Sequence, residues 1–219
     1  MAETPADRDT RETRWEQARA EERAAGQGGY GAHFARLIDE GVDIEGEARL
    51  ADALVPRDGW ILDAGSGMGR VGGALAARGH RVVAVDFDQE VLDQSRRTYP
   101  DLPVVESRLD HLTPETLSAA GFPTTYDLIV CVGNVMILLA PETERTVLAN
   151  LAALLAPEGR LLVGFAQSGA PAGASREYPA EEFAADAAAV GLQIESRFAT
   201  YDLRPLTHES TFAVHVLTR

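Results

Sequence analysis

Short apolar runs alternate with amphipathic stretches along most of the chain, beginning at residue 59. The apolar runs are residues 60–62, 82–85, 103–105, 128–132 and 160–165. After each run the spacing of apolar residues favours a helix, most clearly over residues 142–155 and 180–190. Continuous apolar strands that alternate with helices are typical of a parallel sheet covered on both faces. We therefore predict a doubly wound α/β fold.

The two ends of the chain depart from this alternation. Residues 193–203 and 211–217 are extended in pattern and only the turn-like residues 204–209 separate them, so we expect a hairpin that adds an antiparallel strand to the sheet. At the other end, residues 1–55 are charge-dense and favour helices. We interpret residues 1–55 as a helical cap that acts as a lid, followed by a main domain over residues 56–219.

Composition narrows the class of protein. The 219 residues carry a net charge of −14, and arginine supplies all the positive charge apart from histidine. Such a charge repels phosphate backbones and anionic lipids, so we expect neither nucleic acid nor membrane as a partner. No apolar run is long enough to span a membrane, the start of the chain has no apolar signal region, and Cys131 is the only cysteine. We expect a cytoplasmic bacterial protein; its oligomeric state is not indicated.

A glycine-rich turn follows the first apolar run, with the sequence Asp-Ala-Gly-Ser-Gly-Met-Gly over residues 63–69. Gly65, Gly67 and Gly69 let a ligand approach the backbone closely. In the dinucleotide fingerprint a third glycine would stand at position 70, which is Arg70, and Asp63 would repel a pyrophosphate. The turn therefore favours S-adenosylmethionine, which has no phosphate and carries a sulfonium and an ammonium group, over a nicotinamide cofactor.

A second acidic residue, Asp86, ends the run 82–85 and stands 21 positions after Gly65. A carboxylate at this place can accept hydrogen bonds from both ribose hydroxyls, and Phe87 can offer an apolar face to adenine. The alternative is that Asp86 caps the helix that follows it.

Together these segments resemble the class I S-adenosylmethionine-dependent methyltransferases. The resemblance covers residues 60–219 and rests on residues 61–70, Val85-Asp86, the segment Tyr-Asp-Leu-Ile at 126–129 and the closing hairpin. It implies a Rossmann-like sheet of seven strands with the last one antiparallel, Gly65 and Gly67 beside the methionine portion, and Asp86 on the ribose. The implied cofactor contacts, which include residues after the third and fourth strands, are Asp63, Gly65, Ser66, Gly67, Gly69, Asp86, Phe87, Leu109, Asp110 and Val132.

The sequence departs from the family pattern after the third strand. Asp110 is the candidate for the acidic residue that reads the adenine amino group, while an alignment on Arg108 would leave only backbone contacts. After the fourth strand, the sequence from Asn134 to Ile137 lacks the Asn-Pro-Pro-aromatic pattern of enzymes that methylate planar amines in adenine or glutamine. This absence argues further against a nucleic-acid acceptor. Because the chain has no large insertion after the fourth strand and only a modest loop over residues 167–178 after the fifth, we expect a small-molecule acceptor, which the sequence does not identify.

Methyl transfer to such an acceptor is an in-line displacement that mainly needs alignment in a dry pocket, and it yields S-adenosylhomocysteine. A hydroxyl acceptor would also need a base, for which His33 and His208 are the candidates, although both are as simply explained as surface residues. Tyr30 and Tyr201 are candidates to cover the pocket. The histidines and Cys131 show no metal-ligand spacing, so we expect no metal. The main alternative is a catalytically silent domain that binds the same cofactor as a sensor or partner subunit.

Overall fold

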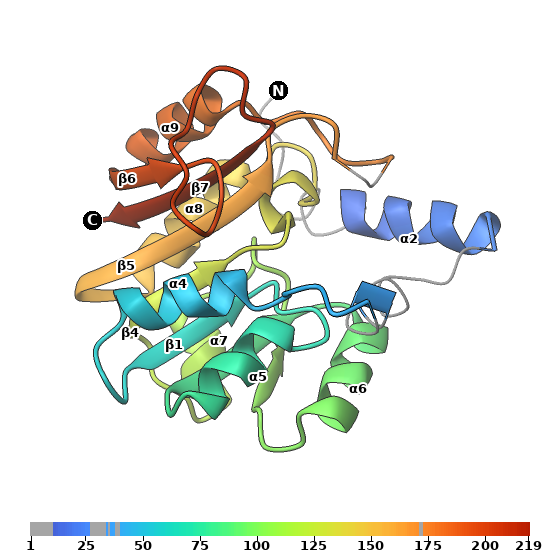
Figure 1. Ribbon diagram of the computed structural model, residues 1–219. Helices are drawn as coiled ribbons and strands as arrows, with labels where there is room; N and C mark the ends of the chain where they lie inside the picture. The colour runs from blue at the N-terminus through green and yellow to red at the C-terminus, as the bar shows by residue number, and fades with distance from the viewer. Residues whose placement is uncertain (1–10, 27–33, 35, 38–39, 171–172) are drawn as a thin grey trace, which may run out of the picture.

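Seven strands in the part of the chain that the structure describes form one sheet with helices on both faces (Figure 1). The computed structural model describes residues 11–26, 34, 36–37, 40–170 and 173–219. The described helices are α2 (Arg14–Ala24), α4 (Gly46–Leu54), α5 (Arg70–Ala77), α6 (Gln89–Thr98), α7 (Pro114–Ala119), the 3-10 turn η1 (Val135–Ile137), α8 (Glu144–Ala153) and α9 (Ala180–Ala189). The strands are β1 (Trp60–Ala64), β2 (Arg81–Asp86), β3 (Val104–Glu106), β4 (Tyr126–Cys131), β5 (Leu155–Ala166), β6 (Gln193–Phe198) and β7 (Phe212–Thr218).

The strand order is β3-β2-β1-β4-β5-β7-β6. The pairs from β3 to β5 are parallel, and β7 runs antiparallel to both β5 and β6. The predicted α/β sheet with an antiparallel closing hairpin strand is therefore confirmed. The boundary after α8 differs from the expected one, because Leu155 pairs with Tyr126 of β4 and so belongs to β5 instead of ending the helix.

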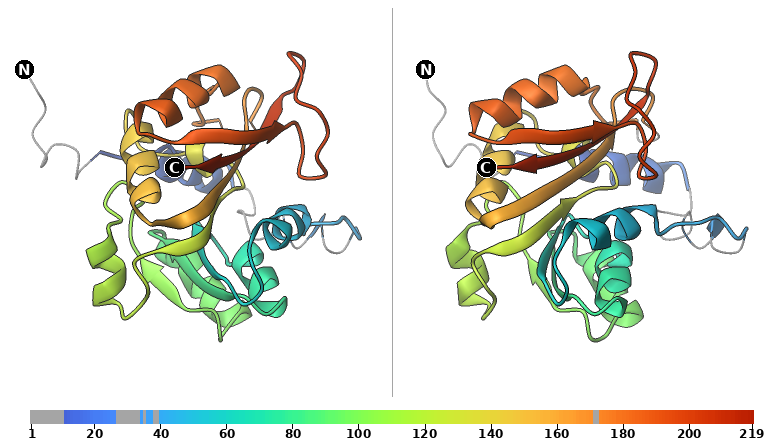
Figure 2. Two further views of the ribbon diagram at one scale, coloured as in Figure 1. Left: turned by 90° about the vertical axis from the view of Figure 1, so that its left-hand side faces the viewer. Right: turned by 60° about the vertical axis from the view of Figure 1, so that its left-hand side comes forward.

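Helices lie on both faces of the sheet (Figure 2), and an apolar core fills the space on each face. On one face, Leu50 of α4 and Leu75 of α5 cover β1, β2 and β4. On the other, Leu148 of α8 and Phe183 of α9 cover the same sheet together with α7. Strands buried on both faces explain why the apolar runs in the sequence are continuous.

Local sequence signals set where the helices begin. Thr13 caps α2 through a capping box, in which its hydroxyl accepts from the backbone N–H of Glu16 and the Glu16 carboxylate accepts from Thr13. Asp88 caps α6, and Thr113 caps α7 with a proline in the first turn. No helix within the described ranges is long and apolar enough to cross a membrane.

The connections leave β1 and β4 in opposite directions, since β1 leads to β2 on one side and β4 leads to β5 on the other. In open α/β sheets, ligands bind at the carboxyl ends of the strands beside such a switch point. Helix α2 lies beside this edge of the sheet (Figure 1). Of the predicted cap, α2 and α4 lie within the described residues, whereas most of the helix expected over residues 30–40, with Tyr30 and His33, lies outside them.

Candidate functional site

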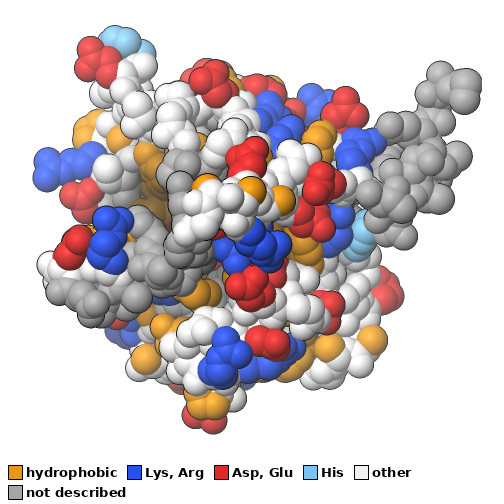
Figure 3. Space-filling model, turned by 90° about the vertical axis from the view of Figure 1, so that its right-hand side faces the viewer, with side chains coloured by type: hydrophobic (Ala, Val, Ile, Leu, Met, Phe, Trp, Pro, Cys, Tyr) orange, Lys and Arg blue, Asp and Glu red, His pale blue; other side chains and the backbone are white. Residues whose placement is uncertain are grey.

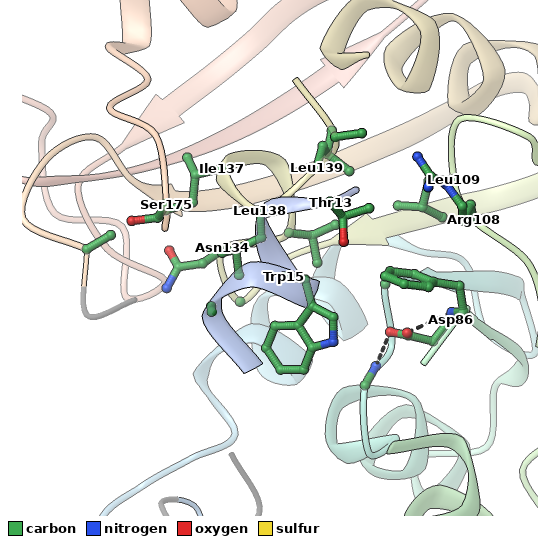
Figure 4. A pocket seen from close by; sticks show the side chains of 18 of the residues that line it. Thr13, Trp15, Asp86, Arg108, Leu109, Asn134, Ile137, Leu138, Leu139 and Ser175 are labelled. Atoms are coloured by element: carbon green, nitrogen blue, oxygen red, sulfur yellow. Dashed lines mark hydrogen bonds between the residues drawn. The ribbon is translucent and has the colours of Figure 1, made fainter. Parts of the chain in front are cut away.

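A cavity of about 780 Å³ opens at this edge of the sheet. Loops that follow β1, β2, β3, β4 and β5 line it, and α2 and α4 close one side. In Figure 4, Trp15 of α2 lies between Asp86 and Asn134, which sit towards opposite ends. The volume falls within the range of roughly 300–1000 Å³ that is typical of pockets for drug-sized ligands.

The glycine-rich turn forms the floor of the cavity through Gly65 and Gly67, which have φ angles of 78° and 53°. A side chain would be strained at either backbone conformation. A Cβ atom on Gly65 would also lie only 2.5 Å from a methyl group of Val135. The turn is therefore built so that bare backbone faces the cavity, which fits a ligand that must approach the chain closely.

The carboxylate of Asp86 is held beside this turn by three backbone groups. Its Oδ2 accepts a hydrogen bond from the N–H of Gly67 at 2.9 Å, and its Oδ1 accepts from Phe87 at 2.7 Å and from Asp88 at 3.0 Å. Burial raises the pKa of Asp86 despite these hydrogen bonds, which lower it. An ionised carboxylate can accept about four hydrogen bonds, so one acceptor position, on Oδ2, is left for a ligand hydroxyl.

Four of the residues predicted to contact the cofactor are absent from the described lining of the cavity, namely Asp63, Ser66, Gly69 and Val132. The buried carboxylate of Asp63 instead accepts from the N–H of Gly72 at 2.8 Å, and burial raises its pKa to about 7. It therefore fixes the start of α5 from behind the turn. Gly69 has a similar structural reason to be glycine, because a Cβ there would lie 2.5 Å from the hydroxyl oxygen of Ser95.

Asp110 and Arg108, the two residues considered from the sequence for the adenine site, both lie at the cavity. Arg108, Leu109 and Asp110 all line it. Arg108 binds Asp110 through two hydrogen bonds of 3.0 and 2.8 Å, and it also donates to the backbone oxygen of Arg11 at 2.9 Å. The two residues therefore act as one unit that joins this segment to the start of α2.

Helix α2 contributes cavity residues that sequence reasoning did not single out. Thr13, Trp15, Ala18 and Glu22 line the cavity, and the indole nitrogen of Trp15 donates to Asp88 at 2.8 Å. The capping box at Thr13 was a readable signal for the start of this helix. The hydrogen bond from Trp15 to Asp88 joins residues more than seventy positions apart, so no local sequence pattern predicts that α2 packs there.

The α4 side of the cavity holds a half-buried ion pair that the sequence did not predict. Arg70 pairs with Glu47 at 2.6 Å, both side chains are only 14% exposed, and the guanidinium lies over the Phe34 ring at 4.8 Å. Arg70 thus holds α4 and Phe34 against the start of α5. The sequence showed Arg70 only as a missing third glycine.

We call the side of the cavity opposite Asp86 the β5 end and define it by Asn134, Val135, Ala170, Tyr201 and Phe212; its Val135 lies next to Gly65 of the glycine-rich turn. Gly133 and Asn134 both adopt left-handed conformations, with φ angles of 73° and 75°. The amide oxygen of Asn134 accepts from the N–H of Ala166 at 2.8 Å. Tyr201 and Phe212 form an edge-to-face ring pair with centroids 5.7 Å apart.

The remaining candidate residues lie elsewhere. The side chain of His208 is 91% exposed in the loop between β6 and β7, and the structure does not bring it to the cavity. His33 lies outside the described residues. Cys131 is buried in β4, where burial raises its thiol pKa and keeps it from acting as a nucleophile. Among the described residues, no group of three or more His, Cys, Asp or Glu side chains could hold a metal ion.

Acidic and basic side chains stand next to one another on the face shown in Figure 3. Such neighbouring charges form ion pairs elsewhere in the described chain too, for example Arg19 and Arg23 with Glu90, each at 3.0 Å. This face therefore shows no broad area of positive charge of the kind that binds a phosphate backbone.

Comparisons with known proteins agree with this geometry. Residues 61–159 match the family described as a methyltransferase domain. A solved TehB-like SAM-dependent methyltransferase from Corynebacterium glutamicum is 37% identical, with 87% of this chain and 96% of that chain covered and a TM-score of 0.76. A Burkholderia thailandensis 1,6-didemethyltoxoflavin-N1-methyltransferase, solved with its acceptor and S-adenosylhomocysteine, is 23% identical over 86% of this chain and 87% of that chain, with a TM-score of 0.57.

A curated protein shows a shorter match. The mitochondrial ubiquinone biosynthesis O-methyltransferase of Schizosaccharomyces pombe is 29% identical over 103 residues. The match covers 47% of this chain and 36% of the yeast protein, so the chain spans about a third of the length of that relative.

Proposed function

Because this chain belongs to the S-adenosylmethionine-dependent methyltransferases, we propose that it transfers the methyl group of this cofactor to a small-molecule acceptor. The observation that carries the proposal is one continuous cavity that joins the Gly65–Gly67 turn and Asp86 to the apolar β5 end. One end suits an amino-acid nucleoside and the other leaves room for a second molecule.

S-adenosylmethionine supplies a methyl group on a sulfonium, which is a good leaving group. In the proposed arrangement Oδ2 of Asp86 accepts a hydrogen bond from a ribose hydroxyl, and the bare backbone at Gly65 and Gly67 admits the methionine portion. Leu109 and Asp110 line the adenine end, where the carboxylate of Asp110 accepts from the adenine amino group while Arg108 holds it in place.

Helix α2 is proposed to act as the lid. Its start is tied to the loop after β4, since the N–H of Trp15 donates to Leu138 at 3.0 Å, and to the first residue of α8, since Arg14 forms an ion pair with Glu144 at 3.4 Å. Its other side is tied to Asp88 by Trp15, and to Glu90 by Arg19. In this proposal, contacts on both of its sides hold α2 over the cavity, and the helix excludes water from it.

The chain's contribution to chemistry would be alignment of the acceptor with the methyl group in line with the sulfur. Such positioning alone can account for several kcal/mol of the barrier, roughly 7–11 kcal/mol in the best intramolecular cases. For an acceptor whose hydroxyl must lose a proton, His33 is the base we propose from the sequence. A His33→Gln variant should then lose turnover without losing cofactor affinity.

Two measurements test the proposed function. Isothermal titration calorimetry with S-adenosylhomocysteine tests the cofactor site, and a screen with S-adenosylmethionine carrying a radiolabelled methyl group tests transfer to a panel of small amines, phenols, thiols and heterocycles. Binding together with a labelled product supports the proposal. Binding with no labelled product across the panel would instead favour a silent sensor, and absence of binding would refute the site.

A further inference from the structure

The side-chain amide of Asn134 has a fixed orientation at the β5 end. Its oxygen accepts from the N–H of Ala166, so the amide nitrogen Nδ2 is turned away from β5. Nδ2 has no hydrogen-bond partner within the described ranges, and Asn134 lines the cavity. Left-handed backbone is uncommon outside glycine and costs free energy, so the turn at residues 133–134 is held by its surroundings. The turn thus presents a hydrogen-bond donor to whatever occupies this end.

The side chains that share the β5 end with Asn134 are apolar or aromatic, and the polar side chain of Ser175 lines the cavity as well. Val135 follows Asn134 directly, Ala170 lies on the loop after β5, and the Tyr201–Phe212 ring pair completes the wall. In Figure 4 the amide of Asn134 lies on the opposite side of Trp15 from Asp86. Aromatic walls of this kind favour an aromatic ligand through offset or edge-to-face contacts.

Charged side chains of α2 and α4 that line the cavity form ion pairs. Glu47 and Arg70 form their half-buried ion pair at 2.6 Å, and Glu22 of α2 pairs with the buried Arg19 at 2.8 Å. An ionised ligand that displaced one of these partners would leave a buried charge uncompensated, which is costly. The β5 end therefore favours an uncharged occupant.

We propose that the methyl acceptor is an uncharged aromatic molecule, one of whose hydrogen-bond-accepting atoms receives a hydrogen bond from Asn134 Nδ2. The proposal rests on the function proposed above, because it assigns the β5 end to the acceptor. The atom held is a ring nitrogen or a carbonyl oxygen and is distinct from the atom that takes the methyl group. Asn134 is thus a positioning residue that selects the acceptor.

Three probes of similar shape test this assignment by equilibrium dialysis against the enzyme saturated with S-adenosylhomocysteine. Quinoline carries a ring nitrogen that accepts a hydrogen bond, naphthalene has the same two rings without it, and quinoline-2-carboxylate adds a negative charge. We expect quinoline to bind about five- to tenfold more tightly than naphthalene, as one neutral hydrogen bond predicts. Quinoline-2-carboxylate should bind more weakly than quinoline.

Two variants isolate the donor. Asn134→Asp keeps an oxygen for Ala166 and a residue that tolerates left-handed backbone, but it replaces Nδ2 by an acceptor; Asn134→Gly removes the amide altogether. Both should abolish the preference for quinoline over naphthalene and change the Kd of S-adenosylhomocysteine by less than about twofold. Gln193→Ala removes an exposed amide at the start of β6 and serves as the control, which should keep the preference.

The outcomes separate this inference from the proposed function. If S-adenosylhomocysteine does not bind the unmodified enzyme, the proposed function fails. If it binds but quinoline shows no preference, or the variants keep that preference, or the carboxylate binds most tightly, the inference fails and the function stands. Failure of both aromatic probes to bind, or loss of S-adenosylhomocysteine affinity in both variants, would also overturn the assignment of Asn134 to the acceptor.

Discussion

The indole nitrogen of Trp15 donates a hydrogen bond to a carboxylate oxygen of Asp88 across 2.8 Å, and this contact joins the first described helix to the loop after β2. The other oxygen of Asp88 accepts from the N–H of Glu90 and so caps α6. One carboxylate therefore fixes both the start of α6 and the position of the ring that crosses the cavity. Movement of α2 must break this hydrogen bond.

Trp15 should report directly on cofactor binding by its fluorescence. The chain has two tryptophans, and Trp60 stands at the start of β1, at the opposite end of that strand from the glycine-rich turn. In a Trp60→Phe variant, S-adenosylhomocysteine should shift or quench the remaining Trp15 emission. The matched Trp15→Phe variant, which keeps only Trp60, should show no change and should bind more weakly by about fivefold, since one hydrogen bond is lost. Equal signals from the two variants would argue against α2 as a lid.

Much of the fold could be read from the sequence, because each buried strand is a continuous apolar run and each helix keeps its own periodicity. The resemblance to class I methyltransferases, drawn from residues 61–70 and Asp86, was confirmed by the comparisons. The position of the Asp63 side chain could not be predicted from the sequence. Its place beside the glycines pointed to the ligand, yet its carboxylate turns back to Gly72, and only three-dimensional packing decides between the two.

The sequence also did not predict that α2 lines the cavity, for a related reason. Contacts such as Trp15 with Asp88 and Arg108 with Arg11 join segments that are far apart in the chain. Periodicity reports which face of a helix is buried but not what covers it. The same limit applies to Asn134, whose importance depends on the N–H of Ala166 from a neighbouring strand.

Replacement of Asp86 by Asn should raise the Kd of S-adenosylhomocysteine by on the order of a hundredfold, because hydrogen bonds to a charged group are lost. The asparagine side chain has the same size, but its amide NH2 group is a donor where the N–H groups of Gly67 and Phe87 and the ribose hydroxyl need an acceptor. Burial raises the pKa of Asp86, so in the unmodified enzyme affinity should begin to fall at a higher pH than for an ordinary aspartate as the solution is acidified. Calorimetry across pH checks both points, and an Asp86→Asn protein with unchanged affinity would contradict the ribose assignment.

Gly67→Val should abolish cofactor binding, because the added side chain would project from the floor of the cavity. Strain from a positive φ angle is a separate effect and needs its own control. Gly121 has a φ angle of 84° and open space around its Cβ position, so Gly121→Val carries backbone strain without blocking the cavity. We expect Gly121→Val to lower the melting temperature but to bind S-adenosylhomocysteine normally. Retained affinity in Gly67→Val would refute the placement of the methionine portion.

His215 of β7 should make the fold less stable in mild acid. Its ring is buried against Phe165 and Phe183, with ring centroids 5.8 and 4.6 Å away, and burial lowers its pKa to about 4. The unfolded chain, with an ordinary histidine pKa of about 6.5, binds the proton first as the pH falls. The contribution of His215 to the free energy of unfolding is therefore highest above about pH 6.5, where the residue is neutral in both states. It falls as the pH drops from about 6.5 towards 4, and about 2 kcal/mol is lost by pH 5.

Urea unfolding at pH 7 and pH 5 measures this loss, and a His215→Phe variant isolates it. Asp63 acts in the opposite sense, because its raised pKa means that the folded state takes up its proton first. Therefore the effect of His215 is measured by the difference in the pH dependence of unfolding between the unmodified protein and His215→Phe. His208→Ala, which changes an exposed histidine, should follow the unmodified protein. Identical pH dependence for all three proteins would show that His215 does not titrate as its burial predicts.

Gly164 and Tyr201 should behave as a coupled pair. A Cβ on Gly164 of β5 would lie 2.0 Å from the phenol oxygen of Tyr201, so Gly164→Ala must displace that ring. Overpacking of this kind typically costs about 1–3 kcal/mol of unfolding free energy. Tyr201→Ala also destabilises the protein on its own, by removing a ring packed against Phe212. In the double variant the added methyl group meets no phenol, so its cost should largely disappear. Urea unfolding of the four proteins gives the coupling free energy, and strictly additive losses would show that the two residues do not compete for the same space.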